Sequence, residues 1–160
     1  PAELIHEWIK KKYYGSFYKN PRNVTLSYKY KKTFIPYWGL KYANKIIKTD
    51  NLIDKTIYLL FSLIDKQIKN FNRLNKSQKK KIMFINFDEM ITSTNRTVEN
   101  LCKFLKTTET KYTKKIIIKE NGNRKIDFSE REKYRSIILR DAGDETVKLY
   151  LKLERAYLKN

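Results

Sequence analysis

The sequence has too few cysteine and histidine residues for several kinds of site. Cys102 is the only cysteine and His6 the only histidine among its 160 residues. A single cysteine excludes an intrachain disulfide and a metal site built from several thiolates. A single histidine excludes a site with several imidazole ligands.

Long apolar runs are also missing. The longest helix-like apolar tract, TIYLLFSLI at residues 56–64, is flanked by Lys55 and Asp65. A membrane-spanning helix needs about 20 apolar residues, so we expect a soluble, cytoplasmic protein without a membrane span. The chain opens at Pro1 rather than at a methionine. We expect it to be a piece of a longer protein, and an upstream targeting segment stays an open alternative.

Acidic residues are scarce relative to basic ones. The chain has 36 Lys and Arg against 17 Asp and Glu, which gives a formal net charge of +19. Such a charge favours an anionic partner such as a nucleic acid, a phosphate, a sulfate or an acidic membrane surface. The alternative is codon bias, because Lys, Asn and Ile are abundant together and the lysines are dispersed. The total charge does not distinguish an anionic partner from codon bias, so the argument for a partner depends on specific residues.

Apolar spacing and turn residues predict the first elements. Residues 2–11 have the periodicity of a short amphipathic helix, and the aromatic run from 13 to 18 is typical of a buried strand. Pro21 ends that strand and suits the first turn of a helix, which we expect to continue through Leu26 and Tyr28.

The middle of the chain is predicted to be helical. We expect helix over residues 33–80, weakly interrupted at 36–39. Its main part is a long helix capped by Asp50 or Asn51. A polar connection at 75–80 follows.

The second half begins with KIMFINF at residues 81–87, a largely apolar run of strand length that we interpret as a central strand. A helix capped by Thr94 or Asn95 should follow, through Leu105. The run KKIIIK is too short to assign. Residues 120–127 read as a turn, and 129–158 as one or two helices separated near Gly143. Alternating strands and helices predict an α/β fold with a parallel sheet.

The loop after the first predicted strand has the parts of a phosphate site. Lys19 and Arg22 supply positive charge, the predicted helix start supplies backbone N–H groups, and Ser27 supplies a hydroxyl. In α/β folds, ligands bind at the carboxyl ends of the strands, where this loop should lie. A solvated basic turn is the alternative.

This segment resembles a motif of the P-loop sulfotransferases. KNPRNVTLSY, at residues 19–28, is similar to that family's RNPRDVAVSY, which binds the 3′-phosphate of the donor 3′-phosphoadenosine 5′-phosphosulfate (PAPS). The preceding residues resemble the family's HLPxxLLPxxxxxxxKVIYVARNP. Residues 81–105 resemble NVLFLRYEDLLxDPxxTVxxIAEFL. The three segments occur in the family's order.

The resemblance implies roles for individual residues. Ser27 falls on the serine that binds the 3′-phosphate, Lys19 replaces an arginine, and Arg22 matches a commonly basic position. Phe87 replaces the tyrosine of the YED motif, beside the adenosine. Arg124 and Lys125 are loosely similar to residues that close over the 3′-phosphate. The residues expected to line the acceptor pocket are Tyr30, Phe34 and Trp38.

Two motifs of the family are missing from the sequence. It has no glycine-rich loop for the 5′-phosphosulfate. The catalytic histidine of the HLP motif should precede Pro1, and His6 does not occupy its position. We therefore expect one partial sulfotransferase-like domain over residues 1–160, equivalent to the C-terminal part of the enzyme. It should have an incomplete P-loop-type parallel sheet flanked by helices and a helix-rich C-terminal part.

Four segments of this partial domain have different expected roles. Residues 1–30 contain the 3′-phosphate motif and 31–80 the helical acceptor side. Residues 81–128 contain a second strand–helix unit and a turn, and 129–160 the C-terminal helices. The fragment alone is expected to bind the nucleotide weakly and to be inactive.

The resemblance implies transfer of a sulfuryl group from PAPS, without a metal, to a hydroxyl or amine of an unknown carbohydrate, lipid or small molecule. Two alternatives come from other classes of protein. A basic nucleic-acid-binding module would use the charge and the many tyrosines, although no RNP-like or helix-turn-helix signature occurs in the sequence. A P-loop nucleotide kinase relative would share the fold and require an upstream Walker loop.

Overall fold

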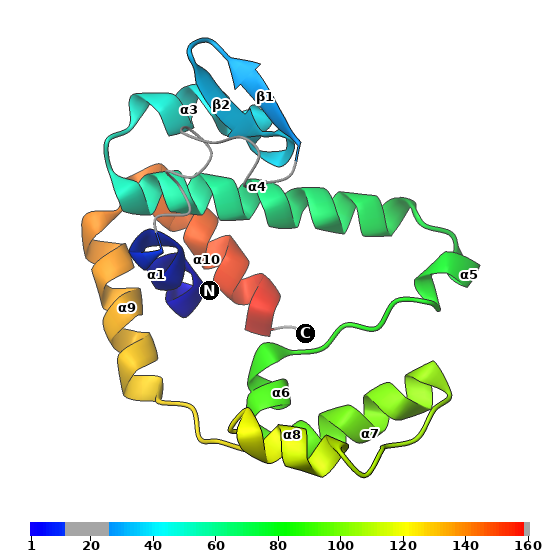
Figure 1. Ribbon diagram of the computed structural model, residues 1–160. Coiled ribbons are helices and arrows are strands. Elements are labelled where there is room, and N and C mark those ends of the chain that lie inside the picture. The colour runs from blue at the N-terminus through cyan, green and yellow to red at the C-terminus, as the bar shows by residue number, and fades with distance from the viewer. Residues whose placement is uncertain (12–25, 159–160) are drawn as a thin grey trace. The chain divides into compact units, whose positions relative to one another are not determined.

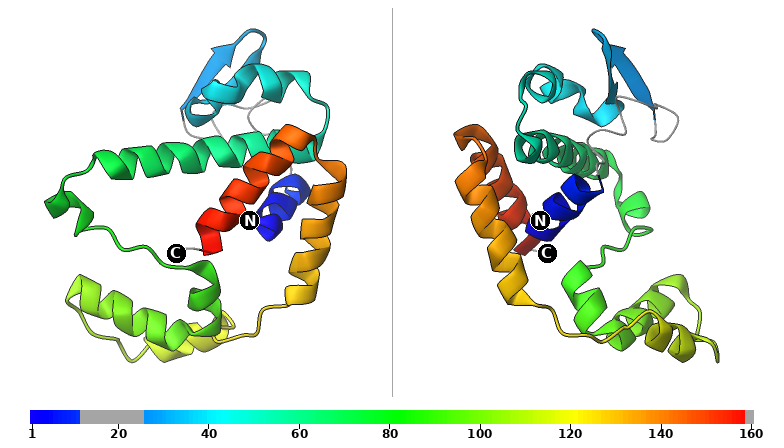
Figure 2. Two further views of the ribbon diagram at one scale, coloured as in Figure 1. Left: turned by 180° about the vertical axis from the view of Figure 1, so that it is seen from behind. Right: turned by 60° about the vertical axis from the view of Figure 1, so that its left-hand side comes forward.

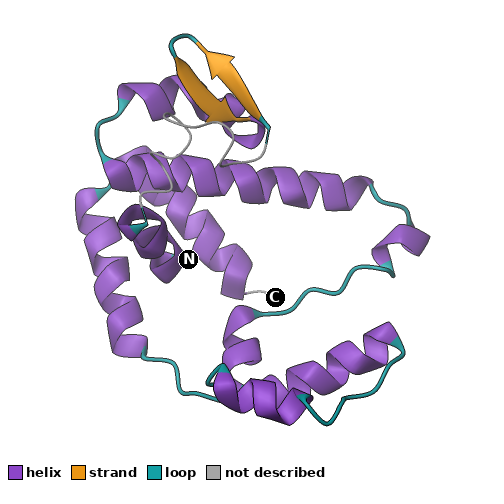
Figure 3. Cartoon of the chain, in the orientation of Figure 1, coloured by secondary structure: helices purple, strands orange, loops and turns teal. Residues whose placement is uncertain are grey.

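The computed structural model describes residues 1–11 and 26–158. They form two compact units, Pro1–Arg73 with Ser129–Asn160, and Leu74–Phe128. Helices make up most of both units, and one pair of strands belongs to the first (Figure 3). The predicted strand at 13–18 lies outside the described residues. No helix among the described residues is long and apolar enough to cross a membrane.

The first unit is organised around its longest helix, α4 (Leu52–Arg73). It also contains α1 (Ala2–Lys10), the strands β1 (Ser27–Tyr30) and β2 (Thr33–Pro36), the 3-10 helix η2 (Tyr37–Tyr42), α3 (Ala43–Lys48), α9 (Phe128–Asp141) and α10 (Asp144–Leu158). The hairpin, η2 and α3 lie along one side of α4, and α1 and α10 pack against another (Figures 1 and 2). Because it has neighbours on several sides, α4 is buried at five consecutive positions, 56–60.

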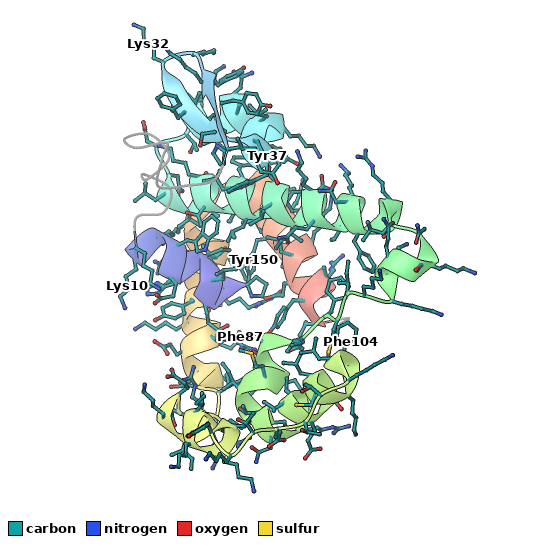
Figure 4. All side chains as sticks on the ribbon, turned by 45° about the vertical axis from the view of Figure 1, so that its right-hand side comes forward. Lys10, Lys32, Tyr37, Phe87, Phe104 and Tyr150 are labelled. Carbon is teal, nitrogen blue, oxygen red and sulfur yellow. The ribbon has the colours of Figure 1, made fainter. Side chains whose placement is uncertain are left out.

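The hydrophobic core of this unit comes from segments far apart in the sequence. The largest fully buried side chain is that of Tyr150 on α10, labelled in Figure 4. It belongs to one cluster with Ile5 of α1, Ile46 of α3 and Ile57 of α4. The amphipathic pattern of 2–11 predicted α1 correctly. Residues 129–158 were predicted to form one or two helices, and the structure has two, separated near Gly143.

Polar contacts fix the joint between α9 and α10 against α4. The Asn51 carboxamide oxygen accepts from the N–H of Ile53 at 2.9 Å, which confirms one of the two predicted caps. The Asn51 carboxamide also donates to the carbonyl of Asp141 at 2.7 Å. One turn further along α4, Asp54 accepts from the N–H of Gly143 at 2.9 Å and from the hydroxyl of Thr146.

A second polar cluster links α3, α4 and α10. The Tyr58 hydroxyl donates to Glu145 at 3.1 Å, and Lys45 forms an ion pair with the same carboxylate. Burial, together with the hydrogen bond to Glu145, raises the pKa of Tyr58 to about 12. The hydrogen bond from Lys45 holds the pKa of Glu145 below its usual value, against the effect of partial burial.

The β-hairpin contradicts one expectation. Residues 27–30 form a strand, so the predicted helix through Leu26 and Tyr28 is wrong. β1 pairs with β2 antiparallel, with Ser27 opposite Pro36 and Tyr30 opposite Thr33. A two-residue turn joins the strands, and its first residue, Lys31, has a φ of 56°. Aromatic and β-branched residues on both sides of this turn favour strands.

The same hairpin limits the predicted helix of residues 33–80. β2 and η2 occupy 33–42, so regular α-helix begins only at Ala43. The hairpin is the only sheet among the described residues. The predicted parallel sheet is not seen in that part of the chain.

The second unit has four helices in its described residues: α5 (Lys76–Lys79), α6 (Phe87–Thr92), α7 (Thr94–Leu105) and α8 (Thr113–Lys119). Asn75 and Gln78 form a capping box around α5, within the predicted polar connection. The helix predicted up to Leu105 is confirmed as α7. It starts after Ser93, so the predicted caps Thr94 and Asn95 both lie inside the helix.

The predicted central strand at 81–87 is wrong. Residues 82–86 have no regular structure, and α6 begins at Phe87. Phe84 is 71% exposed. A strand needs a neighbouring strand to satisfy its N–H and C=O groups, and none lies beside this segment among the described residues. The unassigned KKIIIK is part of α8.

Candidate functional site

The residues predicted to bind the donor lie on different elements. Lys19 and Arg22 are outside the described residues. Ser27 is the half-buried first residue of β1, so it does not lie in a helix as expected. Phe87 is the first residue of α6 and is 52% exposed, and Figure 4 labels its side chain. Arg124 and Lys125 follow α8 and are both exposed.

The start of α6 is built by Asn86. Its side-chain oxygen accepts from the N–H of Asp88 at 2.9 Å and from that of Glu89 at 3.3 Å. The two carboxylates lie on the first turn, where the helix dipole stabilises negative charge. The side-chain hydrogen-bond acceptor in this cap is therefore Asn86.

Two of the predicted donor segments lie together within the second unit. The Arg124 N–H donates to the carbonyl of Ile91 at 3.1 Å, one helical turn beyond Phe87 on α6. The N–H of the neighbouring Asn123 donates to the Thr94 hydroxyl at 2.9 Å, at the start of α7. The turn at 120–127 is confirmed, and its backbone is held against the junction of α6 and α7.

Because it has no side chain, Gly122 allows this turn to pack closely against α8 and the start of α7. A Cβ atom at this position would lie 2.7 Å from Cγ2 of Ile117 and 3.1 Å from the Ile117 carbonyl oxygen. We expect Gly122→Ala to destabilise the turn by about 1–3 kcal/mol, the usual cost of overpacking. Amide hydrogen exchange of Asn123 and Arg124 should become faster in the variant.

The matched control for this prediction is Gly143→Ala. A Cβ atom at Gly143 would meet nothing nearer than an Asp54 oxygen at 3.4 Å, an ordinary contact. This variant should leave the exchange of Asn123 and Arg124 unchanged. Unchanged exchange in Gly122→Ala would show that the turn is not tightly packed.

The three residues predicted to line the acceptor pocket lie in different surroundings, and only one of them lines a groove. Tyr30 is paired with Thr33 at the end of the hairpin, and its hydroxyl donates to Asn44 at 2.9 Å. Phe34 is half-buried on β2. Trp38, on η2, lines a groove of about 360 Å³ in the first unit, which we call the η2–α4 groove. Its lining residues are Tyr37, Trp38, Leu40, Lys41, Ser62, Asp65, Lys66, Lys69, Asn70 and Arg73.

Cations predominate in the η2–α4 groove. Lys41, Lys66, Lys69 and Arg73 face a single carboxylate, that of Asp65. Lys69 lies 2.7 Å from Asp65 and Lys41 lies 3.7 Å from it. The hydrogen bond from Lys69 holds the pKa of Asp65 below its usual value, while burial acts in the opposite direction. Asp65 therefore stays ionised at neutral pH, and the lining keeps a net charge of +3.

The cations of this groove were not predicted from the sequence. Lys66, Lys69 and Arg73 follow one another at intervals of three and four residues, which places them on one face of a helix. That spacing was available from the sequence. The spacing alone does not indicate a binding site, because a basic helix face is equally typical of a solvated surface.

Comparison with protein-family models gives a match to the sulfotransferase domain over residues 10–142. The match covers most of the chain, including the second unit, most of the first and the η2–α4 groove. The protein belongs to the sulfotransferase domain family, as the resemblance of residues 19–28 and 81–105 predicted. No curated protein and no solved structure matches the chain.

Membership of this family implies a transferase that uses a nucleotide co-substrate and an acceptor. It favours this class over the nucleic-acid-binding module and the nucleotide kinase. Among residues 1–11 and 26–158, no group of three or more His, Cys, Asp or Glu side chains is placed to hold a metal ion.

Proposed function

We propose that this protein takes part in transferring a sulfuryl group from PAPS to a hydroxyl or amine of an acceptor. The observation that carries the proposal is the family match over residues 10–142, which contains the 3′-phosphate motif at 19–28. In this reaction the acceptor oxygen or nitrogen bonds to sulfur while the bond from sulfur to the phosphate oxygen breaks. Adenosine 3′,5′-bisphosphate leaves, and the acceptor loses its proton. We assign the base to no residue of the chain.

The proposed donor contacts are electrostatic. Lys19 and Arg22 neutralise the 3′-phosphate, and the Ser27 hydroxyl donates a hydrogen bond to one of its oxygens. Sulfuryl transfer, like phosphoryl transfer, depends mainly on positioning and on charge stabilisation. Anchoring the phosphate at the far end of the donor would therefore orient its leaving group. The half-buried position of Ser27 at the start of β1 supports this role, because the β1–β2 ladder holds the backbone there in one conformation.

Residues of the second unit have proposed roles that rest on the resemblance. Phe87 would pack against the adenosine ring, and its 52% exposure leaves the ring accessible for this. Arg124 and Lys125 would add charge for the phosphate. Tyr30, Phe34 and Trp38 of the first unit would contact the acceptor.

Binding of adenosine 3′,5′-bisphosphate tests the proposal. We expect weak binding by calorimetry, and an affinity about tenfold lower for Ser27→Ala. A hydrogen bond to a charged group contributes about 1.5 kcal/mol or more, and 1.4 kcal/mol is a factor of ten in affinity. Ser77→Ala is the matched control, because Ser77 is an exposed serine of α5 with no proposed role. Equal affinities for Ser27→Ala and the unmodified protein would remove the assigned anchor.

A further inference from the structure

The η2–α4 groove combines features that together indicate a ligand. Its lining runs along one face of α4 from Ser62 to Arg73, which is about 16 Å of helix. Its volume, about 360 Å³, is within the range of small-molecule sites. All of its lining residues belong to the first unit, on η2 and α4.

Two of the four cations of the groove are not paired with a carboxylate among the described residues. Among the described residues, Lys66 and Arg73 have no carboxylate partner within ion-pair distance. Lys66 instead lies over the Tyr37 ring, with its ammonium 4.3 Å from the ring centroid. Figure 4 labels Tyr37 beside α4. Two cations seven residues apart on one helix face are thus left for an external anion.

A buried polar group adds a second, independent observation. The Ser62 side chain lines the groove but is only 3% exposed, and its hydroxyl has no hydrogen-bond partner among the described residues. A buried polar group without a partner costs free energy, so a ligand hydroxyl or a ligand-bound water would satisfy it. Asp65 and Asn70 supply further groups that can accept hydrogen bonds from hydroxyls.

We propose that the η2–α4 groove binds an acidic oligosaccharide, with its carboxylate or sulfate groups on Lys66 and Arg73 and its hydroxyls on Asp65, Asn70 and Ser62. The inference deepens the proposed function and rests on it, since the saccharide would be the sulfuryl acceptor. A carboxylate in the middle of the groove suits a ligand with hydroxyl donors better than a bare polyanion, which it would repel.

The test uses the full chain without nucleotide and one defined probe, a hexasaccharide of alternating glucuronate and N-acetylglucosamine. We expect it to bind at least about tenfold more tightly than the neutral hexamer of N-acetylglucosamine, as one charge-assisted contact already contributes this factor. The double variant Lys66→Ala/Arg73→Ala should lose about tenfold or more in affinity for the acidic probe. Circular dichroism should show an unchanged helix content.

The matched control is Lys48→Ala/Lys55→Ala, which removes the same charge from α3 and α4 outside the groove. It should keep the affinity of the unmodified protein. An equal loss in both double variants would overturn the proposal, since binding would then follow net charge alone. Equal affinity for the neutral hexamer would also overturn it, as would tighter binding of a single-stranded oligonucleotide or of polyglutamate of the same charge.

The two binding measurements, with the bisphosphate and with the hexasaccharide, test the donor assignment and the groove proposal separately. If adenosine 3′,5′-bisphosphate binds and depends on Ser27 while the acidic hexasaccharide does not bind, only the groove proposal is wrong. If the hexasaccharide binds through Lys66 and Arg73 while the bisphosphate does not bind, the groove is a saccharide site and the donor assignment is wrong.

Discussion

Tyr150→Ala is expected to lower the free energy of unfolding by about 3–5 kcal/mol, the usual range for removing a buried aromatic ring. The Tyr150 side chain is fully buried in the cluster that joins α10 to α1, α3 and α4. Its removal leaves a cavity between helices from the start and the end of the sequence. We expect the surrounding backbone to move little into this space. Urea unfolding followed by circular dichroism measures the change as a lower midpoint.

The matched variant Tyr150→Phe separates the ring from its hydroxyl. That hydroxyl donates to Glu154 at 2.8 Å, and Arg135 lies 2.9 Å from the same carboxylate. Losing one hydrogen bond costs about 1 kcal/mol, so Tyr150→Phe should keep most of the stability. Equal losses in the two variants would mean that the hydroxyl, and not the packing of the ring, stabilises this region. An unchanged midpoint in Tyr150→Ala would contradict the core described above.

Asp54→Ala should lower the free energy of unfolding by about 2–3 kcal/mol. The Asp54 carboxylate accepts two hydrogen bonds at the start of α10, from the N–H of Gly143 and the hydroxyl of Thr146. Hydrogen bonds to charged groups contribute about 1.5–3 kcal/mol each, and part of that is recovered when water replaces the lost partner. The same urea experiment measures the effect.

Two further variants separate the contribution of the Asp54 hydrogen bonds to stability from that of its charge. Asp54→Asn keeps an acceptor oxygen for Gly143 but removes the charge, so it should lose less stability than Asp54→Ala. Asp50→Ala removes an exposed carboxylate that lies just before α4 and should change stability by less than about 0.5 kcal/mol, as is usual for surface positions. If Asp50→Ala and Asp54→Ala lowered the midpoint equally, the loss would reflect net charge alone.

Local sequence patterns predicted most of the helices correctly. Residues 2–11 and 52–73 place apolar side chains at helical spacing, and Asn51 and Gly143 mark a helix start and a helix break. These features act within a few residues along the chain. They therefore have the same effect whatever packs against the helix.

Two of the wrong predictions concern segments whose structure depends on partners elsewhere in the chain. Residues 27–30 form a strand because β2 supplies the matching ladder, whereas 81–87, which have the composition of a strand, have no strand beside them among the described residues. An apolar run of strand length has no structure of its own until another strand completes its hydrogen bonds. The sequence pattern alone cannot distinguish the two cases.

By itself, the sequence determined the helical segments, the basic charge and the family, through the motif at 19–28 and the segment at 81–105. Only the tertiary structure decided where the cations of α4 lie. Lys66 and Arg73 line a groove because η2, some 30 residues earlier in the chain, packs beside them. Periodicity places residues on one face of a helix, but long-range packing decides whether that face meets water, core or a groove.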